Sequence, residues 1–171
     1  MIGYLEGRII KKEEDRILLL VNHIGYEILL PANVMETIGP AGTEDLISLY
    51  IYYYQTERQP KPTLIGFNLE AEKEFFQYFI SVEAIGPMKA VKAMTIPARE
   101  IARAIEEDDV NRLTKLNGIG KRTAQKIIAT LEGKMGKFAL INSGDKSIQT
   151  VVRDEDYSEL VFDVLITQLG Y

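Results

Sequence analysis

The stretch LNGIGKRTAQKI, residues 116–127, places two glycines and three cations inside a chain whose formal net charge at pH 7 is -5. Glycine adopts positive φ without steric cost and lets another backbone come close. A helix beginning near Lys121 would start with unpaired N–H groups, and its dipole would favour an anion. The stretch therefore predicts a phosphate-binding turn.

A mononucleotide-binding P-loop is the first alternative, and the residues exclude it. That loop requires the pattern G-x-x-x-x-G-K-[ST] after a strand. Here Gly118 lies only two residues before Gly120, Arg122 stands where Ser or Thr is required, and a helix is expected before the turn. The remaining source of phosphate is a nucleic-acid backbone. Because the turn lacks a base-reading helix pattern, we expect contacts that position DNA without reading its sequence.

The unit around this turn occurs twice. AIGPMKAVKAM (84–94) superposes on GIGKRTAQKII (118–128), with Ile, Gly, Ala and Lys at matched positions. Phe79 and Val82 before the first turn match Leu113 and Leu116 before the second. Each copy reads as a helix, a tight glycine turn and a second helix. Repetition at a fixed offset favours a binding role over two ordinary helix C-caps.

Charge is distributed unevenly along the chain. Between residues 110 and 137 the single anion is Glu132, and the cations are Arg112, Lys115, Lys121, Arg122, Lys126, Lys134 and Lys137. A local basic patch on an acidic protein is compatible with a polyanionic partner. The chain has no cysteine and one histidine, His23, which reads as a turn residue. We therefore expect no disulfide, no metal site and no cofactor.

No apolar run approaches the roughly 18 residues that a membrane span requires. The opening MIGYLEGRII also lacks the basic and apolar regions of a signal peptide. We expect a cytoplasmic protein with no membrane association.

The hydrophobic period divides the chain into an α+β multidomain protein. Residues 1–67 contain short β-rich runs typical of a small barrel: RILLLVN (16–22), GYEILLP (25–31) and DLISLYIYYY (45–54). Within this part, 31–39 is expected to form a short helix, 11–15 a charged hairpin tip and 56–62 an exposed polar loop.

From Asn68 the apolar spacing becomes helical. After a first amphipathic helix, further helices are expected over 88–95, 97–106, 108–116 and 121–135, which completes an all-α domain over 68–138. Residues 139–154 read as a flexible linker and 155–171 as one amphipathic helix, which cannot bury its own apolar face.

These features in this order resemble the RuvA family of Holliday-junction-binding proteins: the opening MIGYLEGRI, GYE at 25–27, LIGF at 64–67 and the doubled hairpins. The resemblance covers residues 1–138 well and the remainder weakly. It implies an N-terminal OB-fold barrel, two helix-hairpin-helix motifs, a linker and a small third domain. It also implies a homotetramer, or an octamer, that holds the four-way junction open in DNA recombination and repair. The implied partners are a RuvB-type ATPase motor and a RuvC-type resolvase.

By position, the resemblance assigns contacts with the DNA backbone to both turns: Gly86, Lys89, Gly118, Gly120, Lys121, Arg122, Thr123 and Lys126. It places the motor contact in the third domain, which makes Leu160, Val161, Val164 and Leu165 candidates for it. The helix that carries them, 156–168, either packs on the chain's own body or docks on a partner. The resemblance implies no catalytic residue, because the motor performs the ATP-driven branch migration.

Three departures from the family pattern affect these expectations. Ala84 and Met88 stand where the family has Gly and Lys, so the first hairpin is expected to bind more weakly, with Lys89 as the nearest substitute. The family carries two adjacent carboxylates in the loop before LIGF, an acidic pin at the junction centre, whereas this loop offers only Glu57. The chain also stops at LITQLGY, where the family's third domain continues.

Several alternatives stay open at this point. Tyr50, Tyr52 and Tyr54 either pack the barrel or its interface, or stack bases. The acidic run 106–109 is either a set of helix-dipole partners or the metal site of a structure-specific nuclease. The acidic run 13–15 is either a solvated tip or a surface that steers DNA. A junction-binding module uncoupled from the motor is a third functional reading.

Overall fold

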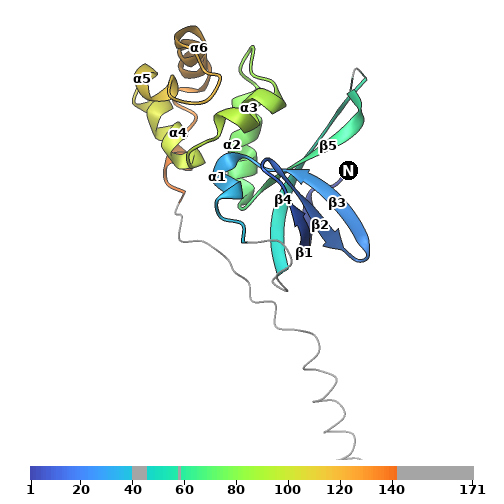
Figure 1. The fold of residues 1–171 in the computed structure, drawn as a ribbon. Coiled ribbons are helices and arrows are strands. Elements are labelled where there is room, and N and C mark those ends of the chain that lie inside the picture. The colour runs from blue at the N-terminus through green and yellow to red at the C-terminus, as the bar shows by residue number, and fades with distance from the viewer. Residues whose placement is uncertain (40–45, 58, 142–171) are drawn as a thin grey trace, which may run out of the picture.

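The computed structural model describes residues 1–39, 46–57 and 59–141 (Figure 1). The predicted C-terminal helix, with Leu160, Val161, Val164 and Leu165, lies outside the described residues, as does the predicted linker from residue 142 onward.

The first part of the chain forms a closed, OB-like five-stranded barrel, as predicted. Its strands are β1 (Tyr4–Lys12), β2 (Arg16–Val21), β3 (Ile24–Leu29), β4 (Leu46–Thr56) and β5 (Gln59–Phe67). They close in the order β1-β2-β3-β5-β4, with only the β3–β5 pair parallel. Alternate residues point inward and are buried, among them Ile17 and Leu19 of β2 and Leu49 and Ile51 of β4. A short helix, α1 (Ala32–Met35), follows β3 at the predicted place.

Two of the predicted turns are confirmed. β1 ends at Lys12 and β2 begins at Arg16, so the charged segment 11–15 is a hairpin tip. Asn22 and His23 connect β2 to β3 and both have positive φ, 47° and 68°. Positive φ at both central residues is the type I′ geometry, whose twist matches that of the flanking strands. His23 therefore has a turn role.

The segment 56–62, predicted to be an exposed loop, is mostly strand, although its residues 56, 57 and 60–62 are exposed as predicted. β4 continues to Thr56 and β5 starts at Gln59, with these two residues paired across the hairpin. Pro60 and Pro62 are tolerated in β5 because that strand pairs with β3 only at Leu64 and Ile65, which leaves the proline-bearing part at a free edge. Glu57 lies in the tight turn and is exposed.

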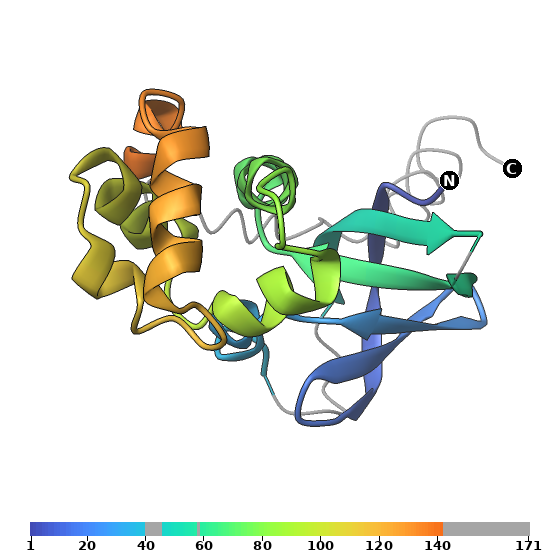
Figure 2. The ribbon, with the colours of Figure 1, turned by 90° about the horizontal axis from the view of Figure 1, so that it is seen from above.

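The second part of the chain is helical. Its helices are α2 (Glu70–Ile80), α3 (Pro87–Ala93), α4 (Ala98–Glu106), α5 (Val110–Leu113), α6 (Lys121–Leu131) and α7 (Gly136–Ala139). Figure 2 shows α2 between the barrel and the group formed by α4, α5 and α6.

Helix α2 joins the two parts through its aromatic side chains. Phe76 packs on Phe67 of β5 and edge-on against Tyr52 of β4, with ring centroids 5.0 and 5.3 Å apart. Phe75 of the same helix packs edge-on against Phe138 of α7, at 5.7 Å. Tyr52 therefore belongs to the packing between barrel and helices, as the packing alternative predicted. Because the four phenylalanine rings belong to one buried cluster and Tyr52 packs against it, the helices are held against the barrel.

The predicted helix over 121–135 is interrupted. α6 ends at Leu131, and Gly133 adopts φ 77°. The carboxylate of Glu106 accepts hydrogen bonds from the N–H groups of Gly133, at 3.1 Å, and Met135, at 2.6 Å. A side chain distant in the sequence thus satisfies the backbone at this break.

The other predicted helix boundaries shift less. The helix expected over 108–116 is reduced to α5, because Asp108 has φ 54° and Asp109 caps the helix by accepting from the Arg112 N–H at 2.9 Å. α7 includes Ala139, the first residue of the predicted linker.

Close packing in the barrel gives a prediction for Gly7. A Cβ at this position would lie 2.1 Å from the carbonyl oxygen of Leu20, in the neighbouring strand. We expect Gly7→Ala to lower the free energy of unfolding by about 3 kcal/mol, the upper part of the usual range for overpacking, since strand backbone must move to relieve the overlap. Urea denaturation followed by circular dichroism measures this change. Gly25→Ala is the control, because the nearest atom to its Cβ is the flexible Leu18 side chain at 3.3 Å. Equal stability of the two variants would contradict the prediction.

Candidate nucleic-acid interface

The sequence repeat is also a backbone repeat. Ala84 and Gly118, at matched positions, have φ values of 71° and 76°. Two residues later, Gly86 has φ -87° and ψ 168°, and Gly120 has φ -88° and ψ 170°. The connection from α2 to α3 and the connection from α5 to α6 therefore form two hairpins of the same shape, which we call the first and second hairpins.

The same buried anchors and hydrogen bonds hold both hairpins. Ile85 and Ile119 are buried, and their N–H groups donate to the carbonyls of Val82 and Leu116 at 3.0 and 3.1 Å. The helix that follows each turn begins with a hydrogen bond from an alanine N–H to the glycine carbonyl. Ala90 donates to Gly86, and Ala124 donates to Gly120. The repeated apolar residues thus fix the turn, which leaves the residues between them free to serve another purpose.

The second hairpin presents bare backbone donors. Among the described residues, none accepts a hydrogen bond from the N–H groups of Lys121, Arg122 or Thr123 at the start of α6. These donors coincide with the positive end of the helix dipole, so the position favours an anion. The first hairpin offers fewer donors, because α3 begins with Pro87, which has no N–H.

Glycine stands at positions 86, 118 and 120 for two different reasons. Gly118 needs to be glycine because of its positive φ. Gly86 and Gly120 have φ values that any residue adopts, and a Cβ added to either would meet no atom within 4 Å. Packing within the described chain therefore does not require glycine at 86 or 120. Its effect there is to leave the backbone open to close approach from outside.

The predicted contact side chains lie on the two hairpins, and they differ in exposure and in whether they already have a partner. Lys121 and Arg122 are exposed, and Thr123 is half-buried. The Lys89 ammonium lies 3.4 Å from the carbonyl oxygen of Ala84, over its own hairpin. Lys126 is already paired: its Nζ lies 2.7 Å from Oε2 of Glu83, in the first hairpin.

Glu83 was not among the residues predicted from the sequence, although the repeat carries a signal for it. The repeat matches Glu83 to Asn117, so one turn has an acid where the other has an amide. The matched lysines also differ. Lys126 pairs with Glu83, whereas Lys92 is exposed.

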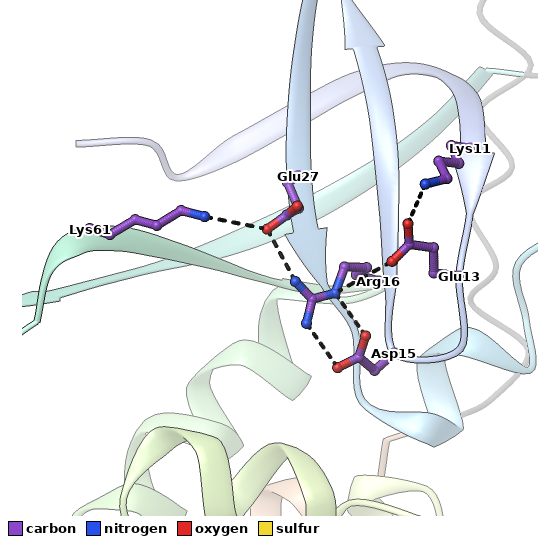
Figure 3. A network of polar contacts seen from close by, with 6 residues as sticks. All are labelled: Lys11, Glu13, Asp15, Arg16, Glu27 and Lys61. Atoms are coloured by element: carbon purple, nitrogen blue, oxygen red, sulfur yellow. Dashed lines mark hydrogen bonds and ion pairs between the residues drawn. The ribbon is translucent and has the colours of Figure 1, made fainter.

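The charged residues at the barrel tip form a network of their own (Figure 3). Arg16 donates to Asp15, at 2.8 Å, and to Glu27, at 3.2 Å, while Lys11 pairs with Glu13. The hydrogen bond from the Arg16 guanidinium is the main cause that lowers the pKa of Asp15. Two of the three acids in the run 13–15 are thus neutralised by neighbouring cations, which weakens the DNA-steering alternative.

The acidic run 106–109 also has local partners. Glu106 binds the α6–α7 connection and Asp109 caps α5, as described above. In the part of the chain that the structure describes, no group of three or more His, Cys, Asp or Glu residues is placed to hold a metal ion.

Within the same residues, no helix is both long and apolar enough to span a membrane.

The strain at Ala84 gives a prediction. Left-handed φ costs a residue with a Cβ about 1–2 kcal/mol, which glycine avoids, although glycine also increases the entropy of the unfolded chain. We expect Ala84→Gly to raise the free energy of unfolding by about 0.5–1 kcal/mol, measured by urea denaturation. Gly118→Ala is the reciprocal variant and should lower it by about 1 kcal/mol or more. A loss of stability in Ala84→Gly would contradict this account of the first hairpin.

Comparison with known proteins supports the architecture seen in the structure. Residues 1–61 match the family model described as the RuvA N terminal domain, and residues 76–132 match that of a SAM-like helix-hairpin-helix tandem. The chain is 53% identical over its full length to the Holliday junction branch migration complex subunit RuvA of Desulfosudis oleivorans, covering 82% of that protein. It is 54% identical to the subunit of the same name from Desulfatibacillum aliphaticivorans and 33% identical to that from Geobacter sulfurreducens, again over the whole chain and 83% of each relative. The chain therefore belongs to the RuvA family.

Proposed function

We propose that this protein binds Holliday junctions through the DNA backbone, independently of sequence, as a non-catalytic subunit of an ATP-driven branch migration complex. The observation that carries the proposal is the pair of superposable hairpins, each of which offers open glycine backbone and unpaired N–H groups at one surface. A DNA phosphate supplies the acceptor that these donors lack.

The second hairpin is the stronger of the two phosphate sites in this proposal. The start of α6 brings together three backbone N–H groups, the exposed charges of Lys121 and Arg122, and the Thr123 hydroxyl. In the first hairpin Gly86 leaves the same open approach, and Lys89 is the nearest cation. That hairpin lacks one donor because of Pro87 and carries the strained Ala84. A phosphate bound there is therefore held by fewer contacts.

The partners in this proposal follow from the names of the relatives, each a Holliday junction branch migration complex subunit. We infer a homotetramer or octamer, a RuvB-type ATPase motor and a RuvC-type resolvase, acting on DNA in the cytoplasm in recombination and repair. No catalytic residue, cofactor or metal is assigned to this subunit. We assign the motor contact to Leu160, Val161, Val164 and Leu165 on the basis of the family resemblance alone.

Glu57 is our candidate for the pin at the junction centre. The C-terminal end of β4 and the N-terminal end of β5 extend to the same side of the molecule as the α2–α3 connection (Figure 1). Glu57 is exposed in the turn between these strands. A single carboxylate repels phosphates less than the two of the family pattern, so we expect a weak pin.

Gly120→Ala tests the open-backbone argument. We expect roughly tenfold weaker binding of a synthetic four-way junction, about 1.4 kcal/mol, because the new methyl group occupies the space through which a phosphate approaches. The free energy of unfolding should change by less than about 1 kcal/mol, since φ of -88° suits alanine and only an N-cap preference is removed. Fluorescence anisotropy with a labelled junction measures the dissociation constant, Kd.

Gly136→Ala is the matched control for this experiment. Gly136 also has open space around its missing Cβ, but it begins α7, beyond the opposite end of α6. Its variant should bind the junction like the unaltered protein. Unchanged binding by Gly120→Ala, or an equal loss in both variants, would contradict the proposed phosphate site.

Charge reversal tests the electrostatic part of the proposal. The double variant Lys121→Glu, Arg122→Glu should weaken binding to junctions of different sequence alike. It should also flatten the log–log dependence of the binding constant on salt by about 0.9 for each phosphate that the variant no longer neutralises. An unchanged slope would contradict the assignment.

The same binding mixtures, incubated with magnesium and run on a denaturing gel, test the nuclease alternative, because cleaved strands would contradict a non-catalytic role.

A further inference from the structure

An ion pair crosses between the two hairpins at the proposed DNA surface. Glu83, in the turn of the first hairpin, lies 2.7 Å from the ammonium of Lys126, on α6 of the second. The Glu83 side chain is 84% exposed and the Lys126 side chain 39%. The structure gives this carboxylate no second hydrogen-bond or ion-pair partner among the described residues. Its only attachment there is therefore to Lys126, a lysine that the family resemblance assigns to the DNA backbone.

The position of Glu83 is unusual within the repeat. It is the only acid in the segment 81–93, and the corresponding segment 115–127 has none, with Asn117 at the matched place. An anion thus stands directly before Ala84, in the hairpin that has fewer backbone donors. It opposes a phosphate that approaches either this turn or Lys126.

The strength of the pair decides whether DNA can displace it. Exposed ion pairs contribute little to stability, and salt weakens them further. The hydrogen bond from Lys126 lowers the pKa of Glu83, so the carboxylate is charged at neutral pH. A phosphate held by several N–H groups of α6 has more partners than Glu83 has. The pair is therefore weak enough to open and charged enough to reduce affinity.

We propose that Glu83 competes with the DNA phosphate for Lys126 and so limits both the affinity of the interface and its salt dependence. This inference rests on the proposed function. In the free protein Glu83 neutralises Lys126. In the complex the ammonium turns to a phosphate, and the released carboxylate takes up a cation from solution, which offsets one of the counterions that DNA releases.

The test compares four variants by junction binding over a range of salt concentrations: Glu83→Gln, Lys126→Gln, the double variant, and Glu132→Gln. We expect Glu83→Gln to lower Kd about three- to tenfold at low salt and to steepen the log–log salt slope by up to about 0.9. In the Lys126→Gln background, the further change Glu83→Gln should lower Kd by less than about twofold, because there is then no lysine for which Glu83 and the phosphate compete. Glu132→Gln changes the net charge equally, on an exposed residue just after α6, and should leave Kd unchanged within about twofold.

Three results would overturn the proposal. Unchanged or weaker binding by Glu83→Gln would show that Glu83 does not compete, and weaker binding would instead make it a residue that positions Lys126. An equal gain with and without Lys126, or an equal gain in Glu132→Gln, would show a general charge effect. Because Glu83 and Lys126 lie on the surface, all variants should unfold at the temperature of the unaltered protein. If the unaltered protein does not bind junctions, the proposed function itself fails. If it binds, and Gly120→Ala weakens binding while Glu83→Gln changes nothing, only the competition fails.

Discussion

Backbone N–H groups at the start of a helix have no acceptor within that helix, and this constraint organises the proposed DNA-binding surface. At two of the described helix starts a nearby side chain supplies an acceptor: Asp109 does so for α5, and Glu72 accepts from the N–H groups of Asn68 and Leu69 before α2. At α6 none of the side chains that the structure describes caps the helix, and the preceding residue is a bare glycine. The donors are thus kept available, at a cost that only an outside acceptor or water offsets.

The rest of the fold holds these donors in place. Buried residues of both hairpins and of α2 belong to the same core as the barrel, so the turns are anchored on a rigid body. Phe75 and Phe76 make this connection from successive positions of α2, one toward α7 and the other toward the barrel. Glu106 then fixes the end of α6 by binding Gly133 and Met135. Rigid presentation matters here because donors that are already oriented lose less entropy when they bind a ligand.

The two hairpins share one backbone shape but not one chemistry. The matched φ and ψ values show that the repeated apolar residues are sufficient to define the turn. At the exposed positions the copies differ: Pro87, Met88 and Glu83 in the first correspond to Lys121, Arg122 and Asn117 in the second. The protein thus combines a donor-rich hairpin with a donor-poor one that also carries an anion. In the proposed complex, a duplex that lies across both hairpins is therefore held mainly by the second.

Local chemistry in the sequence was sufficient for the barrel strands, the short helices, the repeat and the basic turn, because hydrophobic period and glycine position act over a few residues. Tertiary contacts decided the rest. The strands β4 and β5 extend through a polar, proline-containing segment because they pair with each other, and α6 stops at Leu131 where Gly133 turns the chain and Glu106 binds the segment that follows. The pairing of Lys126 with Glu83 joins residues 43 positions apart, so it depends on how the hairpins pack. The sequence alone determined which residues bear charge and which turns lack side chains. Only the folded chain decided which of those charges face one another, because that depends on the distances between elements.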